Sequence, residues 1–191
     1  LARKLIFSKW REALGGNLEF VLAGSAPTQA RLIKVFTAAG IPILEGYGMT
    51  ETSPAVSVTD FRNKGFKIGT VGKIIDDVEV KIADDGEILV KGPNIMMGYY
   101  KNEDLTNDTI KNGYLHTGDI GELDNEGFLK ITDRKKEIFK TSGGKYIAPA
   151  VLEADLKKSR FIEQVMVIGE SQKMPAALIQ VHYEFIYEWA K

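Results

Sequence analysis

The alternation of apolar runs with a helical pattern over residues 18–44 constrains the fold of this 191-residue chain most strongly. Leu18–Ala23 is a short continuous apolar run that predicts a buried strand, and Ile41–Leu44 predicts a second strand. Between them, Pro27 begins and Gly40 ends a segment with helical apolar spacing. A strand, a helix and a strand at this spacing predict a right-handed crossover between parallel strands. This part of the chain therefore belongs to an α/β sheet.

Ligands of open α/β sheets bind beyond the carboxyl ends of the strands. Two predicted turns lie at such ends. Gly24, Ser25 and Ala26 follow the first strand, and the segment 46–51 follows the second. We expect the two turns to face one crevice.

The stretch Leu44–Pro54 combines two glycines, a proline and several polar groups, and we expect it to be a loop rather than regular structure. The ring of Tyr47, the hydroxyl of Thr50 and the carboxylate of Glu51 suit a purine, a phosphate and a divalent cation. The residues alone fit a tight turn after a buried strand equally well, in which Thr50 and Glu51 open a helix.

After Pro54 the pattern changes to short alternating segments separated by Asp-Gly and Glu-Gly turns, which predict hairpins. These segments are Val78–Ile82, Glu87–Val90 and Phe128–Thr132. They indicate an antiparallel sheet or a small barrel, interrupted by a short helix over Asn102–Ile110.

The charge cluster Asp133–Glu137 separates two apolar segments and predicts a linker. A helix over Pro149–Lys158 and strands near Val165–Ile168 and Ala176–Val181 indicate a separate small α+β unit. A further helix is expected over Glu184–Ala190, as is an amphipathic helix at the start of the chain, from Ala2.

The composition excludes several classes of function. With no cysteine the chain has neither disulfides nor thiolate metal sites, and its two histidines are too far apart for a local metal motif. A net charge of −1 gives no electrostatic footprint for nucleic acid. No apolar run is long enough to span a bilayer, and the start of the chain lacks the features of a signal peptide. We expect a cytoplasmic location.

Polar clusters at Thr117–Asp119 and Asp133–Glu137 are expected to lie in loops. Asp119, Arg134 and the segment that follows Lys140 have two interpretations each. Asp119 could accept both hydroxyls of a ribose or form an ordinary Asx turn. Arg134 could grip a phosphate or a ribose oxygen, or belong to a solvated charge run. The glycine-rich segment Thr141–Lys145, next to Lys140, could approach an anionic cofactor, but it lacks full P-loop spacing and such segments are more often hairpin turns.

The order of the motifs says more than any one of them. They are Glu45–Pro54, Gly69–Gly72, Tyr114–Asp119 and Asp133–Pro149. In this order the chain resembles the adenylate-forming (ANL) superfamily, which includes acyl-CoA synthetases, firefly luciferase and peptide-synthetase adenylation domains. It looks most like the long-chain fatty-acid CoA ligases, because of the first motif and the form of Thr141–Pro149. The resemblance covers nearly the whole chain and favours the functional interpretations.

The resemblance implies an adenosine site. Residues that would flank the adenine and acyl pocket are Gly24, Ser25 and Ala26, and those that would line the adenine are Gly46, Tyr47 and Gly48. Thr50 would contact phosphate, Glu51 would hold Mg2+, and Asp119, assisted by Arg134, would bind the ribose hydroxyls. Lys136 matches the hinge of the small C-terminal domain. Residues that would meet coenzyme A are Lys140, Gly143 and Gly144.

The implied architecture has three parts. Residues 1–60 would end a large α/β adenylate-binding domain, 61–135 would form its antiparallel, β-barrel-like subdomain, and 136–191 would be an incomplete small α+β domain. The phosphate loop expected before residue 1 and the lysine expected after residue 191 are absent, so we expect an inactive fragment that needs the upstream part of its own chain.

The implied reaction has two steps. A fatty-acid carboxylate attacks the α-phosphate of ATP to give an acyl-adenylate and pyrophosphate, and the thiol of coenzyme A then displaces AMP. Two alternatives stay open: a non-catalytic nucleotide-binding or regulatory module, and an adenylating enzyme that loads a carrier protein. Peripheral membrane association also stays open, because long-chain acids partition into bilayers.

Overall fold

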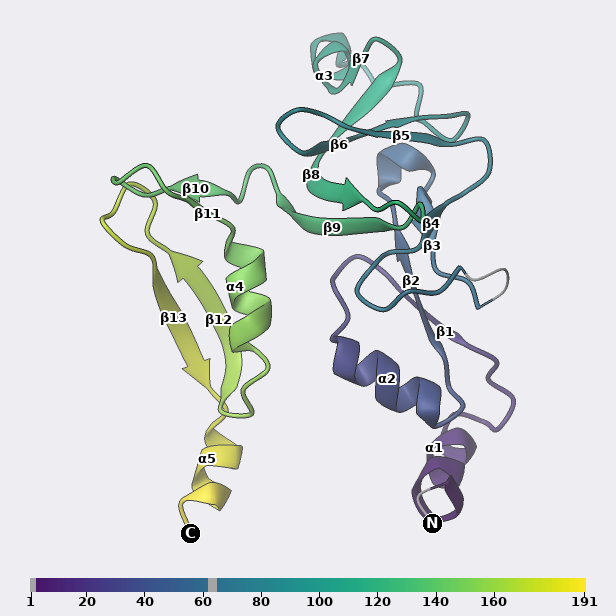
Figure 1. The fold of residues 1–191 in the computed structure, drawn as a ribbon, viewed down its shortest axis with the longest axis vertical. Helices are drawn as coiled ribbons and strands as arrows, with labels where there is room; N and C mark the ends of the chain where they lie inside the picture. The colour runs from purple at the N-terminus through teal and green to yellow at the C-terminus, as the bar shows by residue number, and fades with distance from the viewer. Residues whose placement is uncertain (1–2, 62–64) are drawn as a thin grey trace. The chain divides into compact units, whose positions relative to one another are not determined.

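The computed structural model describes residues 3–61 and 65–191 (Figure 1). The chain forms two compact units. The first unit runs to Thr117 and includes Glu122–Ile131, and the second contains Gly118–Gly121 and Thr132–Lys191. The predicted domain boundaries near residues 60 and 135 stay predictions. Ala2, the predicted start of the first helix, lies outside the described residues.

The first unit opens with the predicted strand–helix–strand pattern. Its elements are a π-helical turn η1 (Arg3–Phe7), α1 (Ser8–Ala13), β1 (Val21–Ala23), α2 (Ala30–Ala38) and β2 (Ile43–Tyr47). β1 and β2 are parallel, with Leu22 opposite Leu44. Ile33 of α2 and Ala39 at its end are buried. The predicted crossover is therefore confirmed.

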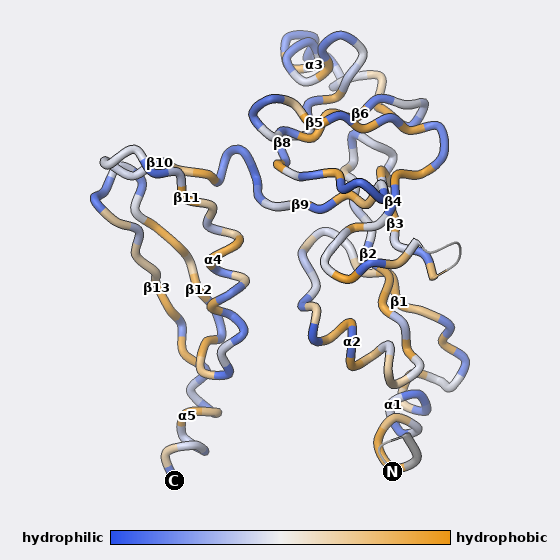
Figure 2. Tube along the Cα trace, in the orientation of Figure 1, coloured by the Kyte–Doolittle hydropathy of each residue, from blue (hydrophilic) through white to orange (hydrophobic). Residues whose placement is uncertain are grey.

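β1 is less buried than its sequence predicts. Figure 2 shows the hydrophobic residues along β1, yet Phe20, Val21 and Leu22 are 48%, 37% and 60% exposed. The reason is topological: β1 is the end strand of the sheet β1-β2-β3-β4, and among the described strands it pairs with β2 alone. An apolar run predicts a buried strand only when layers of structure cover both of its faces.

The expectation that Leu44–Pro54 is a loop throughout is wrong. β2 continues to Tyr47, and a 3₁₀ turn η2 follows over Thr50–Thr52. Gly46 and Tyr47 pair with Val58 and Ser57 of the antiparallel strand β3 (Ser57–Val58), which pairs in turn with β4 (Lys73–Ile74). Pairing with β3 offsets the low strand propensity of Gly46.

The rest of the first unit is an open antiparallel sheet in the order β5-β6-β8-β7, with β9 beside β8. Its strands are β5 (Glu79–Ile82), β6 (Glu87–Lys91), β7 (Ile110–Lys111), β8 (Tyr114–Leu123) and β9 (Leu129–Arg134), and α3 (Glu103–Thr109) precedes β7. Both predicted hairpins form, and Val56, Ile88, Val90 and Leu129 make the core.

Thr117, Gly118 and Asp119 lie within β8, although we expected a loop position for them. Side chains alternate between the two faces of a strand, so Leu115, Thr117 and Asp119 share the buried face of β8. Because polar residues occupy the buried face of this segment, its sequence does not show the alternation of apolar and polar residues that predicts a strand.

The second unit is the predicted small α+β unit. Its elements are β10 (Phe139–Lys140), β11 (Tyr146–Ile147), α4 (Pro149–Leu156), β12 (Ile162–Ile168), β13 (Ala176–Val181) and α5 (Tyr183–Trp189). β12 and β13 are antiparallel, and α4 contacts β12. The α/β and α+β fold class is thus confirmed, with open sheets. Across residues 3–61 and 65–191, we find no helix with the length and apolar character needed to cross a membrane.

Candidate functional site

The two predicted turns of the parallel sheet lie side by side. Strand register places Ala23 opposite Glu45, and a Cβ added to Gly24 would lie 3.6 Å from the carbonyl oxygen of Gly46. Burial raises the pKa of the Glu45 carboxyl, and a hydrogen bond from the backbone N–H of Thr28 partly offsets this effect. The segment after β1 therefore contacts the end of β2 in two ways, through the close backbone approach of Gly24 to Gly46 and through the side chain of Glu45.

Gly48 has a packing reason for lacking a side chain. A Cβ at this position would overlap the carbonyl oxygen of Pro54. The glycine that the resemblance assigns to the adenine site is thus required first by the folding of its own loop.

Thr52 holds the loop from inside. It is fully buried, and its hydroxyl oxygen lies 3.0 Å from both the backbone nitrogen and the carbonyl oxygen of Met49 and 2.9 Å from the carbonyl oxygen of Pro54. Sequence reasoning missed this residue. Its spacing of three from Met49 is that of a side chain that bonds back to a helix start, and this spacing could have revealed it.

A distant segment supports the same loop. The side-chain amide of Asn94 donates to the carbonyl oxygens of Thr52, at 3.0 Å, and Ala55, at 2.7 Å. The backbone N–H of Met96 donates to the carbonyl oxygen of Glu51 at 2.9 Å. These bonds join segments about 40 residues apart in sequence, and no local pattern predicts them.

Glu51 is half-buried, and its carboxylate has one hydrogen-bond partner among the described residues. The hydroxyl of Tyr99 donates to its Oε1 at 2.8 Å, and this bond is the main reason why the pKa of Tyr99 is raised. No Lys, Arg or His in the described ranges forms an ion pair with Glu51. An uncompensated, partly buried carboxylate fits a bound cation. Its neighbour Thr50 is exposed.

The described residues contain no group of three or more His, Cys, Asp or Glu side chains that could hold a metal ion. Magnesium does not need such a group, because it is commonly bound by one or two carboxylates together with substrate phosphates. The donor set at Glu51 therefore fits a magnesium ion that arrives with a nucleotide.

Asp119 and Arg134 meet within the second unit. Arg134 Nε lies 3.3 Å from Asp119 Oδ1. The Asp119 side chain is 13% exposed, while that of Arg134 is 67% exposed. The backbone supports this pair, since the N–H of Lys135 donates to the carbonyl oxygen of Gly118 at 2.8 Å. The structure thus brings together the two residues predicted to bind ribose.

Asp133 is a buried carboxyl that sequence reasoning did not single out. Its Oδ1 accepts from the backbone N–H of Arg134 at 2.7 Å, whereas its buried Oδ2 has no partner among the described residues. Burial raises the pKa of Asp133, and the charges of Glu137 and Glu153 act in the same direction.

The other predicted residues of the second unit are exposed. Lys136 is exposed between β9 and β10, and Lys140 Nζ lies 5.1 Å from the ring centroid of Tyr146. Gly143 and Gly144 form the turn of the β10–β11 hairpin, and Gly144 has φ +83°. The segment Thr141–Lys145 is thus a hairpin turn, and its approach to an anionic cofactor stays a prediction.

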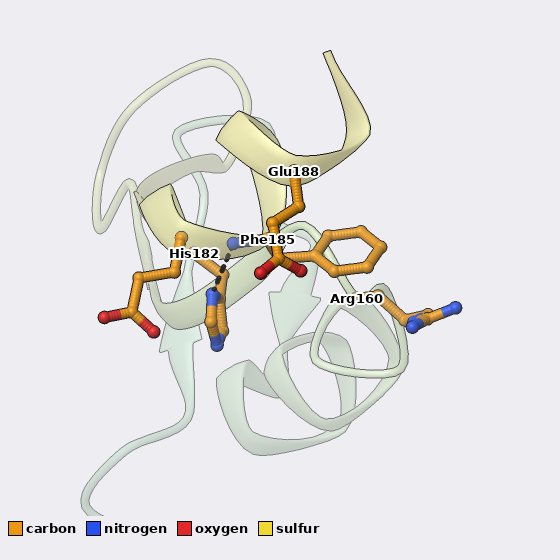
Figure 3. A pocket seen from close by; sticks show the side chains of 5 residues that line it. Arg160, His182, Phe185 and Glu188 are labelled. Carbon is orange, nitrogen blue, oxygen red and sulfur yellow. Dashed lines mark hydrogen bonds between the residues drawn. The ribbon is translucent and has the colours of Figure 1, made fainter. Parts of the chain in front are cut away.

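The two cavities that we describe are small and contain none of the predicted site residues. One, of about 370 Å³ in the second unit, is lined by Arg160, His182, Glu184, Phe185 and Glu188. Figure 3 shows Arg160 beside the ring of Phe185, and Arg160 Cζ lies 4.4 Å from the centroid of that ring. The other, of about 230 Å³ in the first unit, is lined by Met97, Gly98, Tyr99, Glu103, Thr106 and Asn107.

Comparison with known proteins defines the class. The family model described as AMP-binding enzyme matches residues 2–100, more than half of the chain. The chain therefore belongs to the AMP-binding enzyme family, and the resemblance to adenylate-forming enzymes is confirmed.

The relatives are fatty-acid CoA ligases by name. The long-chain-fatty-acid–CoA ligase FadD15 of Mycobacterium bovis is 45% identical, over 97% of this chain and 31% of that protein. Fatty acyl-CoA synthetase B of Dictyostelium discoideum is 37% identical, over 97% of this chain and 30% of that protein. The chain thus spans about a third of the length of these curated relatives.

Solved structures agree with this assignment. O-succinylbenzoate coenzyme A synthetase (MenE) of Bacillus subtilis, in complex with ATP and magnesium ion, is 32% identical with a TM-score of 0.76, covering 91% of this chain and 40% of that one. A fatty acyl CoA synthetase of Mycobacterium tuberculosis is 27% identical with a TM-score of 0.62, covering 97% and 40%.

Proposed function

We propose that this chain is part of an ATP-dependent long-chain fatty-acid CoA ligase. The observation that carries the proposal is the environment of Glu51, a half-buried carboxylate fixed by Tyr99 and without a cationic partner among the described residues. The names of the relatives support the substrate class, and the ATP and magnesium of a related solved structure support the cofactors.

In the first step, the residues of the first unit would hold ATP while a fatty-acid carboxylate attacks its α-phosphate. Tyr47 and the backbone near Gly24 and Gly46 would contact the adenine, and Thr50 would donate a hydrogen bond to a phosphate. Glu51 would hold Mg2+, which when bound neutralises charge that develops on the phosphates. The products are an acyl-adenylate and pyrophosphate.

In the second unit, Asp119 would accept hydrogen bonds from the ribose hydroxyls, and the guanidinium of Arg134 would orient its carboxylate. In the second step, rotation about Lys136 would bring Lys140 and the turn of Gly143 and Gly144 to coenzyme A. The thiol then attacks the acyl carbonyl carbon, and AMP leaves as the thioester forms.

ATP–pyrophosphate exchange by the complete protein, with acetate, octanoate and palmitate in turn, tests the proposal. We expect palmitate to support exchange and Glu51→Ala to lower it at least 100-fold, because the substitution removes the metal ligand. Exchange with none of the acids, from a folded protein, would favour a nucleotide-binding module instead. Supplying coenzyme A or a carrier protein afterwards identifies the thiol that accepts the acyl group.

A further inference from the structure

We propose that Tyr99 is a positioning residue for the carboxylate of Glu51. The proposal rests on the proposed function, because Tyr99 has this role only if Glu51 holds Mg2+. No sequence motif that we identified contains Tyr99, which lies 48 residues after Glu51.

The two carboxylate oxygens of Glu51 have different surroundings. Oε1 of Glu51 accepts the hydroxyl proton of Tyr99 at 2.8 Å. Among the described residues, Oε2 has no hydrogen-bond partner, so this oxygen is available to a cation. A glutamate side chain rotates about three bonds, and a donor on one oxygen fixes the direction of the other.

The backbone on both sides of this bond is also held. The carbonyl oxygen of Glu51 accepts from the N–H of Met96 at 2.9 Å. The N–H of Tyr99 donates to the hydroxyl of Thr106 at 2.9 Å, and this hydroxyl donates to the carbonyl oxygen of Asn102 at 2.8 Å, at the start of α3. Glu51 and Tyr99 are therefore linked twice, through their side chains and through the short segment 96–99.

Partners of this kind affect metal binding without touching the metal. Hydrogen bonds to a ligating carboxylate orient it, and their removal typically lowers metal affinity by 10–100-fold. Tyr99→Phe keeps the ring and removes only the hydroxyl. The substitution therefore tests the orientation of Glu51 while the packing of the ring of residue 99 is kept.

The chain offers a matched control. The hydroxyl of Tyr114, also in the first unit, donates to Oε1 of Glu79 at 2.7 Å, and neither residue has a role in the proposed function. Tyr114→Phe therefore removes another tyrosine–glutamate hydrogen bond, of 2.7 Å against 2.8 Å for the bond between Tyr99 and Glu51. Equal changes in thermal stability for the two variants show that their folding is equally affected.

The direct measurement is Mn2+ binding to the complete protein in the presence of a non-hydrolysable ATP analogue, followed by electron paramagnetic resonance. We expect Tyr99→Phe to weaken Mn2+ binding about 10-fold and Tyr114→Phe to leave it unchanged. In ATP–pyrophosphate exchange, Tyr99→Phe should raise the Mg2+ concentration for half-maximal rate, with most of the rate recovered at saturating Mg2+.

Two outcomes overturn the proposal and are distinguishable. If Glu51→Ala weakens Mn2+ binding and Tyr99→Phe does not, the positioning role is wrong and the proposed function stands. If Glu51→Ala itself leaves Mn2+ binding unchanged, the metal assignment fails and the role of Tyr99 fails with it. As a second test, Tyr99→Phe should add nothing in the Glu51→Ala background, because its effect acts through that carboxylate; an additive loss contradicts the proposal.

Discussion

Three carboxylates of this protein lie in different environments, namely those of Glu51, Asp124 and Asp133. Glu51 bonds a neutral phenol, Asp124 bonds the ammonium of Lys67 at 2.7 Å, and Asp133 is buried with one oxygen unpartnered among the described residues. Desolvation favours the neutral form of a carboxyl, whereas a nearby cation favours the charged form. These environments give two predictions of pH dependence.

Asp124 should stabilise the folded state mainly above its ordinary pKa. The hydrogen bond from Lys67, followed by those from the backbone of Phe128 and Glu126, lowers the pKa of Asp124 from 3.8 to about 2. A lowered folded-state pKa gives stability that is present above pH 3.8 and lost as the pH falls through about 2.

We therefore expect Asp124→Asn to flatten the pH dependence of the free energy of unfolding in this window, measured by denaturant unfolding at a series of pH values. Asp76→Asn, which removes an exposed carboxylate without a hydrogen bond among the described residues, is the control. An unchanged slope in Asp124→Asn would contradict the prediction.

Asp133 should act in the opposite direction. Its pKa is raised by burial, so the folded state favours the protonated form and loses stability as the pH rises through the raised value. Asp133→Asn keeps an oxygen for the N–H of Arg134 and removes the charge. We expect a gain of about 1 kcal/mol at pH 7 in denaturant unfolding, because a buried unpaired charge costs more than a neutral amide. A loss of stability at pH 7 would show that the charge is compensated.

At the level of elements, the loop after β2 is fixed by the segment that follows β6. Asn94, Met96 and Tyr99 form hydrogen bonds to residues 51–55. Irregular backbone of this kind needs partners for its polar groups, since an unpaired buried carbonyl destabilises the fold. The shape of the proposed metal site therefore depends on a segment outside it.

Asn94→Ala should destabilise the protein by about 2 kcal/mol, because it leaves the carbonyl oxygens of Thr52 and Ala55 without this donor. Denaturant unfolding measures the loss, and amide hydrogen exchange should show faster exchange at Thr52. Asn17→Ala, at an exposed asparagine without a hydrogen bond among the described residues, should change stability by less than about 0.5 kcal/mol. Equal effects of the two substitutions would contradict the prediction.

On the scale of the whole molecule, the two compact units divide the predicted site. Gly24, Tyr47 and Glu51 belong to the first unit, and Asp119 and Arg134 belong to the second. β8 and β9 contain residues of both units, so the pair predicted to bind ribose lies on strands that also belong to the sheet of the first unit. The proposed hinge at Lys136 lies two residues after the end of β9.

Local rules made much of the fold predictable from the sequence. Asn102 accepts from the N–H of Leu105 and begins α3, Gly86 has φ +85° in the turn between β5 and β6, and Pro149 stands at the first turn of α4. Each of these signals depends on residues within one turn of each other. The order of the motifs along the chain also predicted the family, because motif order is read from the sequence without any knowledge of tertiary contacts.

The tertiary structure alone decided which groups meet. It placed Asp119 on the buried face of a strand, left β1 exposed at a sheet end, and joined Tyr99 to Glu51 and Asn94 to Thr52. The sequence by itself determined the types of element, most of the turns and the family, because these follow from neighbouring residues and motif order. Partners about 40 residues apart leave no local pattern, since packing and the need to pair buried polar groups select them only when the chain folds.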